Sequence, residues 1–123
     1  MKANDIFNTV ITLMFGTDKD RNEYEPYFLP TLNMILAENF VVNNALRVSH
    51  GKEALSSVPR AESLEDDILY EDIFCNVIIP YGCAGNIFTE DDRGIGNAYK
   101  NKYEYERTRA LCCCYEEACD VYL

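Results

Sequence analysis

Four cysteines stand close together near the end of the chain, and thiols are the side chains here best suited to chemistry. They are Cys112, Cys113, Cys114 and Cys119. Structural zinc sites usually present cysteines in pairs separated by two to four residues, with a second pair or histidines elsewhere. Adjacent side chains on a helix point about 100° apart, so three consecutive cysteines cannot converge on one ion. We therefore predict that these thiols pack as small apolar side chains and bind no metal.

A disulfide framework is not expected either. The remaining cysteines, Cys75 and Cys83, lie on another segment and also lack pair spacing. The first residues, MKANDIFNTVITLMF, do not have the layout of a secretory signal, because Asp5 interrupts the flank and no cleavage site follows. Thiols of proteins that are not secreted stay reduced. All six cysteines are predicted to be free.

Two other motifs lack residues that their chemistry requires. Segment 18–22, with the sequence DKDRN, is similar to the start of a calcium loop, but Glu23 replaces the glycine and Leu29 replaces the final glutamate. Gly94 and Gly96 are spaced like a phosphate-binding pair, yet no third glycine follows and no strand precedes them. We interpret the first as a solvated loop and the second as a tight turn between helices.

Acid–base or nucleophilic catalysis is not predicted. His50 is the only histidine, and nothing around any serine or cysteine is typical of an activated nucleophile. Glu90, Asp91 and Asp92 are suited to act as acid and base, but adjacent carboxylates at a helix end are more often a solvated cap. The sequence therefore predicts a protein that is not an enzyme and that has no cofactor.

The composition indicates one acidic domain. The chain has 123 residues, of which 21 are acidic and 11 basic, giving a net charge of −10. This balance argues against a primary role in binding nucleic-acid phosphates, which depends on lysine and arginine. It suits a protein that repels polyanions or that docks on basic partners. Apolar runs such as 77–79 are far shorter than the ~20 residues of a membrane span, so no membrane partner is expected.

Hydrophobic periodicity predicts an all-α fold, a small bundle of about four helices with a long connecting loop and an extended C-terminal tail. The helices are expected at 3–15, 28–46, 70–91 and from 96 into the cysteines, with Pro80 either kinking the third or starting a new helix. Segment 16–27 is expected to be a loop, and 47–69 a long surface connection that becomes ordered when a partner binds. Residues 1–119 form the predicted single domain and 120–123 an extended arm.

Segment 79–104 carries a resemblance to a known family. Residues 79–85 (IPYGCAG), the acidic turn 90–92 and the tyrosine-bearing stretch 98–104 together resemble the signature of bacteriophage head–tail connector proteins, also called adaptor or head-completion proteins. The ending 120–122 is similar to a short motif of tail-accessory members. The cysteine run departs from the family, in which alanines and similar small residues are commoner, and this supports a packing role for the thiols.

The resemblance implies a helical bundle, connector-like over 1–119, that assembles as a homo-oligomeric ring, usually a dodecamer, beneath the portal protein. Such a ring lies at the head–tail junction of the virion after assembly in the host cytoplasm. It extends the channel, offers a docking surface for tail proteins and lets DNA pass through its lumen without specific binding. An acidic lumen suits this role because it repels phosphates.

Specific residues are assigned to these contacts. Close helix packing is predicted at Tyr81, Gly82 and Gly85, and Tyr99 and Tyr103 are predicted to pack within the bundle; all five are candidates for the oligomer interface. The predicted contact arm is formed by Asp120, Val121, Tyr122 and Leu123. Two other functions stay open: a small acidic regulatory protein that masks a basic surface of a partner, and a redox or metal module that uses the segment 112–119.

Overall fold

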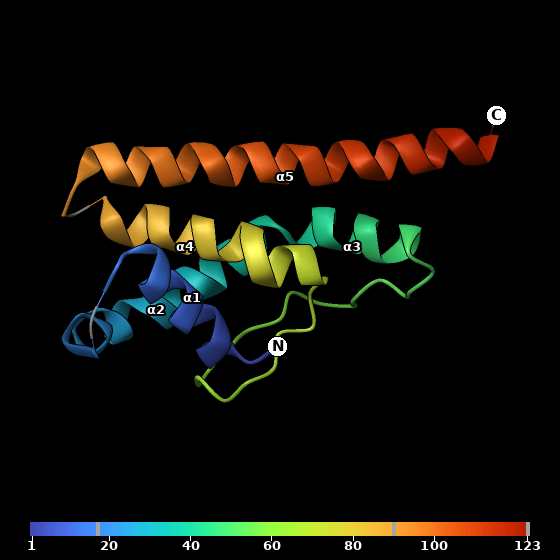
Figure 1. Cartoon of the computed structure of the whole chain (residues 1–123). Coiled ribbons are helices and arrows are strands. Elements are labelled where there is room, and N and C mark those ends of the chain that lie inside the picture. Colours follow the sequence, from blue (N-terminus) through green and yellow to red (C-terminus); the bar gives the residue numbers. More distant parts are fainter. Residues whose placement is uncertain (17, 90, 123) are drawn as a thin grey trace.

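The chain forms an all-α bundle, as predicted. The computed structural model describes residues 1–16, 18–89 and 91–122, with side chains described except at 18, 19 and 113–122. The elements are α1 (Ala3–Leu13), α2 (Asp18–Glu38), α3 (Phe40–Ser49), the π-helical segment η1 (Phe74–Ile78), α4 (Ile79–Phe88) and α5 (Arg93–Tyr122) (Figure 1). Within the described ranges there is no strand, and one isolated bridge pairs Lys2 with Asp67.

Helix α4 lies at the centre of the bundle. Figure 1 shows it between α5 on one side and α1 and α2 on the other. Its side chains are apolar almost all round, and Ile79, Cys83 and Ala84 are fully buried. A helix without a polar face is stable only when neighbours cover it on every side. Helices α1 and α2 complete the core, where the rings of Phe7 and Phe28 stack with centroids 4.5 Å apart.

The second predicted helix has different boundaries. Helix α2 begins at Asp18, so most of the predicted loop 16–27 is helical, and Pro26 and Pro30 lie inside the helix. Both prolines are exposed, so water can bind the carbonyl groups that lose their helical partners. The buried positions Phe28 and Leu32 continue an apolar stripe that outweighs the cost of the prolines.

The predicted helix 28–46 is divided in two. Asn39 separates α2 from α3 with a backbone ψ of 5°, although its own N–H still donates to the carbonyl of Ile35. Asn39 is completely buried. A buried polar side chain at this position requires specific hydrogen-bond partners.

Pro80 follows a widened helical turn. The N–H of Ile79 donates to the carbonyl of Phe74, five residues earlier, as in a π-helix. Pro80 itself has no N–H and occupies the first turn of α4. The π-helical turn of η1 thus accommodates Pro80 where one helical segment directly follows another. For this reason the sequence pattern fits both a kinked helix and the start of a new one.

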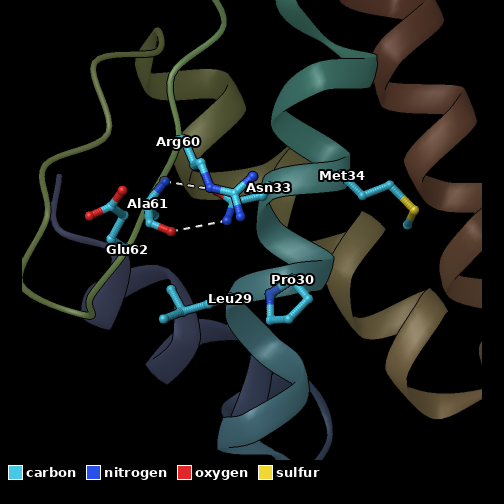
Figure 2. Close-up of a pocket in the computed structure, with 7 residues that line it drawn as sticks. All are labelled: Leu29, Pro30, Asn33, Met34, Arg60, Ala61 and Glu62. Atoms are coloured by element: carbon cyan, nitrogen blue, oxygen red, sulfur yellow. Dashed lines mark hydrogen bonds between the residues drawn. The ribbon is translucent and has the colours of Figure 1, made fainter.

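The long connection after α3 is attached to the helices of its own chain by asparagine side chains. The amide of Asn33 donates to the carbonyl of Ala61 at 2.9 Å and accepts from its N–H at 2.8 Å (Figure 2). Asn44 does the same with Leu55, at 3.1 and 2.8 Å. Each side-chain amide acts as a peptide group would in a sheet, so the connection has defined partners on α2 and α3.

Helix α5 forms the predicted C-terminal tail. It has 30 residues and is therefore about 45 Å long, three times the length of the 10-residue α4. Figure 1 shows its C-terminal end running beyond the other helices. Asp120, Val121 and Tyr122 belong to its last turn, so their backbone is helical where an extended arm was expected, and Leu123 lies outside the described residues. No glycine or proline follows Gly96 to end the helix earlier.

Candidate assembly site

The contact between α4 and α5 depends on glycine. A Cβ atom built on Gly82 would lie 3.1 Å from the ring of Tyr103, and one built on Gly85 would lie 3.1 Å from the backbone nitrogen of Lys100. On the α5 side, a Cβ on Gly96 would lie 3.0 Å from the backbone of Thr89. The two helices approach so closely that their contact has no room for side chains at these positions.

Aromatic side chains flank this contact. The rings of Tyr81 and Tyr99 stack with centroids 6.0 Å apart, and Phe88 lies 6.1 Å from Tyr99. The ammonium group of Lys102 lies 5.6 Å from the centre of the Tyr81 ring, within the range of a cation–π contact. The hydroxyl of Tyr99 donates to the carbonyl of Leu13 at 2.5 Å, which connects α5 to the end of α1.

Tyr103 joins α5 to the break between α2 and α3. Its hydroxyl donates to a carboxylate oxygen of Glu38 at 2.7 Å and accepts from the amide of Asn39 at 2.8 Å. Arg107 donates to the Asn39 side chain and to the Glu38 carbonyl, both at 2.8 Å. Burial raises the pKa of Tyr103 far above its usual range, and Glu38 adds to the shift, so the phenol stays protonated and donates.

The structure therefore brings the five predicted packing residues together within one chain. Gly82, Gly85 and Tyr103 are buried in the α4–α5 contact, while Tyr81 and Tyr99 are half-buried at its edge. Because the three buried residues are already covered by their own chain, a neighbouring copy would contact other residues. Gly82, Gly85 and Tyr103 therefore fix the position of α5 within the chain.

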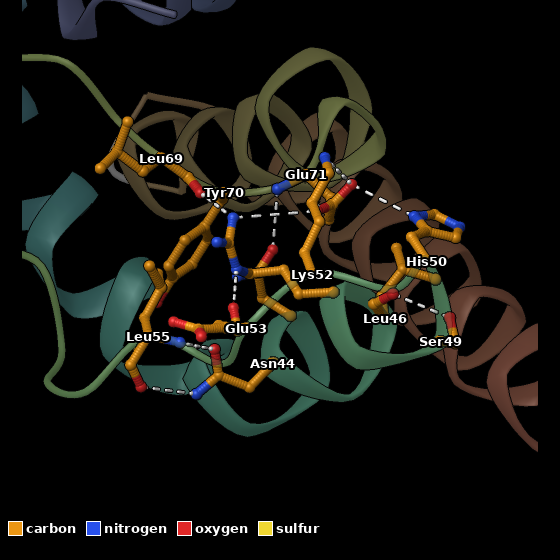
Figure 3. A network of polar contacts seen from close by, with 12 residues as sticks. Asn44, Leu46, Ser49, His50, Lys52, Glu53, Leu55, Leu69, Tyr70 and Glu71 are labelled. Carbon is orange, nitrogen blue, oxygen red and sulfur yellow. Dashed lines mark hydrogen bonds and ion pairs between the residues drawn. The ribbon is translucent and has the colours of Figure 1, made fainter.

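A cluster of charged side chains around Glu71 was not predicted. The carboxylate is 7% exposed and receives hydrogen bonds from Lys52, at 3.1 and 3.2 Å, and from His50 at 3.2 Å (Figure 3). Arg47 lies 3.9 Å away. Burial alone would raise the pKa of Glu71, but the hydrogen bonds from Lys52 and His50 outweigh it, and the pKa is lowered. The contacts span at least 19 residues of sequence, so no local motif signals them.

The Glu71 cluster joins segments that are distant in the sequence. A triad-like site would require a hydroxyl or thiol beside His50. The nearest hydroxyl in sequence, that of Ser49, donates to the carbonyl of Leu46 at 2.8 Å. The backbone N–H of Glu71 donates to the side chain of Asn43 at 2.9 Å. Glu71 thus connects the end of α3 to the segment that enters η1, and His50 serves as one of its donors.

We expect Glu71→Gln to lower the free energy of unfolding at neutral pH by about 1–2 kcal/mol, because it removes a buried charge that accepts hydrogen bonds from Lys52 and His50. The folded-state pKa of Glu71 lies below its ordinary value of 4.5. The difference between wild type and variant should therefore be complete above pH 4.5, decline as the pH falls towards the folded pKa, and vanish below it. Urea denaturation followed by circular dichroism over this range measures it.

Glu65→Gln is the matched control for this experiment. Glu65 pairs with Lys2 at 3.0 Å, but its side chain is 73% exposed, so water screens the pair and stability should hardly change. Equal losses in both variants would show that net charge, rather than the buried cluster, causes the effect.

The cysteines do not share one environment. Cys75 and Cys83 are buried in the core, and burial raises the pKa of both thiols, that of Cys75 to about 11. Both act as small apolar side chains, whereas Cys112 is exposed on α5. The side chains of Cys113, Cys114 and Cys119 lie outside the described residues. Among the side chains that are described, no three metal-ligating groups lie close enough to hold an ion.

The other sequence motifs have local structural roles. Segment 18–22 lies in the first turns of α2, so it does not form the loop that calcium ligation requires. Asp92 accepts hydrogen bonds from the N–H groups of Gly94 and Ile95, at 2.9 and 3.2 Å, and so caps α5. Asp91 accepts a hydrogen bond from Tyr24, which raises the pKa of that phenol to about 12. Glu90 lies outside the described residues.

Several hollows lie on the described surface. One, of about 670 Å³, lies between α2 and the long connection, where Asn33 is already engaged with Ala61 (Figure 2). A second, of about 580 Å³, contains Glu23, Asp91 and the tyrosines 24 and 27. A third, of about 270 Å³, lies between α3, η1 and α5.

No protein-family model matches the chain, and comparisons with curated proteins and with solved structures found no match. None of the described helices combines the length and apolarity needed to cross a membrane.

Proposed function

We propose that this chain is a structural virion protein, a bacteriophage head–tail connector whose copies form a ring beneath the portal protein. The observation that carries the proposal is the arrangement of segment 79–104, which resembles the connector signature. Its glycines lie in the α4–α5 contact, Asp91 and Asp92 lie between the two helices, and Tyr99 and Tyr103 connect α5 to the rest of the bundle.

Two further features support a ring around DNA. The net charge of −10 would let a polyanion slide through a lumen without adhering. Helix α5, about 45 Å long, extends past the bundle and offers a surface to a neighbouring copy, the portal or a tail protein.

The proposal is tested by the mass of the purified protein. Light scattering and native mass spectrometry should show a closed oligomer, alone or after addition of a candidate portal protein. Deleting 120–123 should shorten α5 by its last turn and raise the dissociation constant of assembly at least about tenfold. A chain that stays monomeric and binds no portal protein contradicts the proposal, and unchanged assembly after the deletion removes the contact arm from it.

One observation favours the alternative of an acidic regulatory protein. The hollow that contains Glu23 and Asp91 also presents Tyr27, whose side chain is 64% exposed. Carboxylates beside tyrosine rings suit a lysine or arginine side chain of a partner. A monomer or dimer that co-purifies with a basic host protein, and whose binding is lost on Tyr27→Ala, would favour this function over the connector.

A further inference from the structure

Two hollows adjoin at Tyr24, at the end of the bundle where α2 and α5 begin and α4 ends (Figure 1). One, of about 580 Å³, contains Glu23, Tyr27 and Asp91. The other, of about 210 Å³, is lined mainly by apolar residues, among them Met14. Because Tyr24 belongs to the lining of both, the two hollows form one surface with an acidic part and an apolar part, which we call the Tyr24 groove.

The acidic part of the groove has carboxylates but no basic group of this chain in its lining. Glu23 and Asp91 line it, together with tyrosine, threonine, asparagine and isoleucine side chains. Tyr24 donates to one oxygen of Asp91, and no other described group donates to that carboxylate. Among the described side chains, none forms an ion pair with Glu23. Both carboxylates can therefore accept hydrogen bonds from a bound group.

Basic residues near this end of the bundle do not neutralise the groove. The guanidinium of Arg21 lies 4.5 Å from the centre of the Phe7 ring and donates to Asn4 and Asn8 on α1. Arg93 begins α5 but lines neither hollow. Within the described side chains the groove thus keeps its negative charge, and electrostatic complementarity favours a positively charged occupant.

The remaining residues of the acidic part suit an arginine side chain. Tyr27 is 64% exposed, and the face of a tyrosine ring attracts a cation within about 6 Å. The amide of Asn86 donates to the carbonyl of Gly82 at 2.8 Å, which leaves its side-chain oxygen to accept from a ligand. A guanidinium group is planar and has five donors, so it can stack on a ring while it donates to carboxylate and amide oxygens at its edge.

The apolar part has room for one aliphatic side chain. A cavity of about 150 Å³ is enough for a benzene molecule, and this hollow measures about 210 Å³. Ile11 and Met14 belong to its lining, each with 8% of its surface exposed, and Phe88 lies half-buried beside them. A segment with an aliphatic residue next to arginine would therefore fill both parts of the groove.

A second copy of this chain is the less suitable occupant. Each copy has a net charge of −10, so copies repel one another at an acidic surface. Two arginines of α5 are already paired within their own helix, Arg107 with Glu104 at 4.0 Å and Arg109 with Glu106 at 3.7 Å. A different protein with a basic segment matches the groove better.

We propose that the Tyr24 groove binds a basic segment of another protein. An arginine side chain of that segment would lie against Tyr27 and donate to Glu23 and Asp91, and a neighbouring aliphatic side chain would enter the hollow beside Met14. This inference goes beyond the proposed ring, because it names the chemistry of the partner segment, whether the partner is a virion protein or a host protein.

Capped peptides titrated into the ¹⁵N-labelled full chain test the proposal by nuclear magnetic resonance. A peptide of sequence Gly-Leu-Arg-Arg-Gly should bind with a dissociation constant of about 1 mM or less and shift the amide signals of Tyr24 and Tyr27. Replacing its leucine by glycine should weaken binding at least about threefold, because the apolar hollow then stays empty. Replacing both arginines by glutamate should abolish binding.

Variants of the chain locate the contact. Tyr27→Ala and Glu23→Gln should each weaken binding of the arginine peptide about three- to fivefold. Tyr105→Ala is the matched control for the first, because Tyr105 is 65% exposed but lies on α5. Glu65→Gln is the control for the second, because it removes the same charge from a surface pair with Lys2. Both controls should bind the peptide as wild type does.

The groove is refuted if the arginine peptide causes no shifts at concentrations up to about 10 mM, or if the glutamate peptide binds equally well. Equal losses in Glu23→Gln and Glu65→Gln also refute it, because net charge alone would then attract the peptide. These outcomes are separate from the proposed ring. A monomer that binds the peptide keeps the groove and contradicts the ring, whereas a ring that ignores the peptide keeps the ring and contradicts the groove.

Discussion

Replacing Tyr103 by alanine is expected to lower the free energy of unfolding by about 3–5 kcal/mol, the range typical for the loss of a buried aromatic side chain. The Tyr103 side chain is 4% exposed and packs so closely against α4 that a Cβ atom on Gly82 would lie only 3.1 Å from its ring. Removing the ring would therefore leave a cavity between the two helices, which neighbouring atoms cannot easily fill. The substitution also leaves Asn39, which is fully buried, without one of its hydrogen-bond partners. Urea denaturation followed by circular dichroism measures the loss.

Tyr103→Phe separates the two contributions. It keeps the ring and removes only the hydroxyl that contacts Glu38 and Asn39, so we expect a loss of about 1–2 kcal/mol. Tyr105→Ala is the matched control, because Tyr105 is on the same helix but 65% exposed. Its effect should stay within about 0.5 kcal/mol. A Tyr103→Ala variant no less stable than Tyr105→Ala would show that α5 does not depend on this anchor.

The parts of the fold that periodicity predicts are those with a continuous apolar stripe. Helix α1 has Ile6, Phe7 and Val10 at helical spacing, and it forms within two residues of the predicted range. The α4 segment is apolar on every side and its burial follows directly. In both cases local sequence and tertiary packing favour the same structure, which is the condition under which pattern reasoning succeeds.

The differences arise where tertiary packing outweighs a local signal. Pro26 and the charged residues around it indicate a loop, yet the stacking of Phe28 on Phe7 keeps segment 18–30 helical. Asn39 gives no clear helix stop in the sequence, because its role depends on Tyr103, 64 residues away. Long-range partners of this kind cannot be read from local spacing.

The candidate site was predictable only in part. Small residues on one helix and tyrosines on the next make four of the site residues recognisable in the sequence. These are Gly82, Gly85, Tyr99 and Tyr103. The Glu71 cluster is not, since its cations come from the end of α3 and from the connection that follows. The adjacent asparagines 43 and 44 were the one available signal. Two polar residues beside the apolar positions Val42 and Leu46 suggest that they bind a neighbouring backbone.

Gly85→Val is expected to lower the free energy of unfolding by about 3 kcal/mol, at the upper end of the range for overpacked cores. A Cβ at this position would lie 2.8 Å from Cγ of Lys100, 3.1 Å from its backbone nitrogen and 3.4 Å from the carbonyl oxygen of Gly96. The lysine side chain can move, but the two backbone atoms move only if α5 shifts away from α4. Chemical denaturation measures the loss.

Gly94→Val is the matched control, because it makes the same substitution in the first turn of α5, where a Cβ would meet only Asp92 at 3.3 Å. Its effect should stay within about 0.5 kcal/mol. Since α5 leads into the proposed contact arm, displacing this helix by Gly85→Val should also weaken assembly at protein concentrations where the variant is still folded. A Gly85→Val protein as stable as Gly94→Val would mean that α4 and α5 are not in close contact, and the position of α5 on which the proposed ring depends would then be wrong.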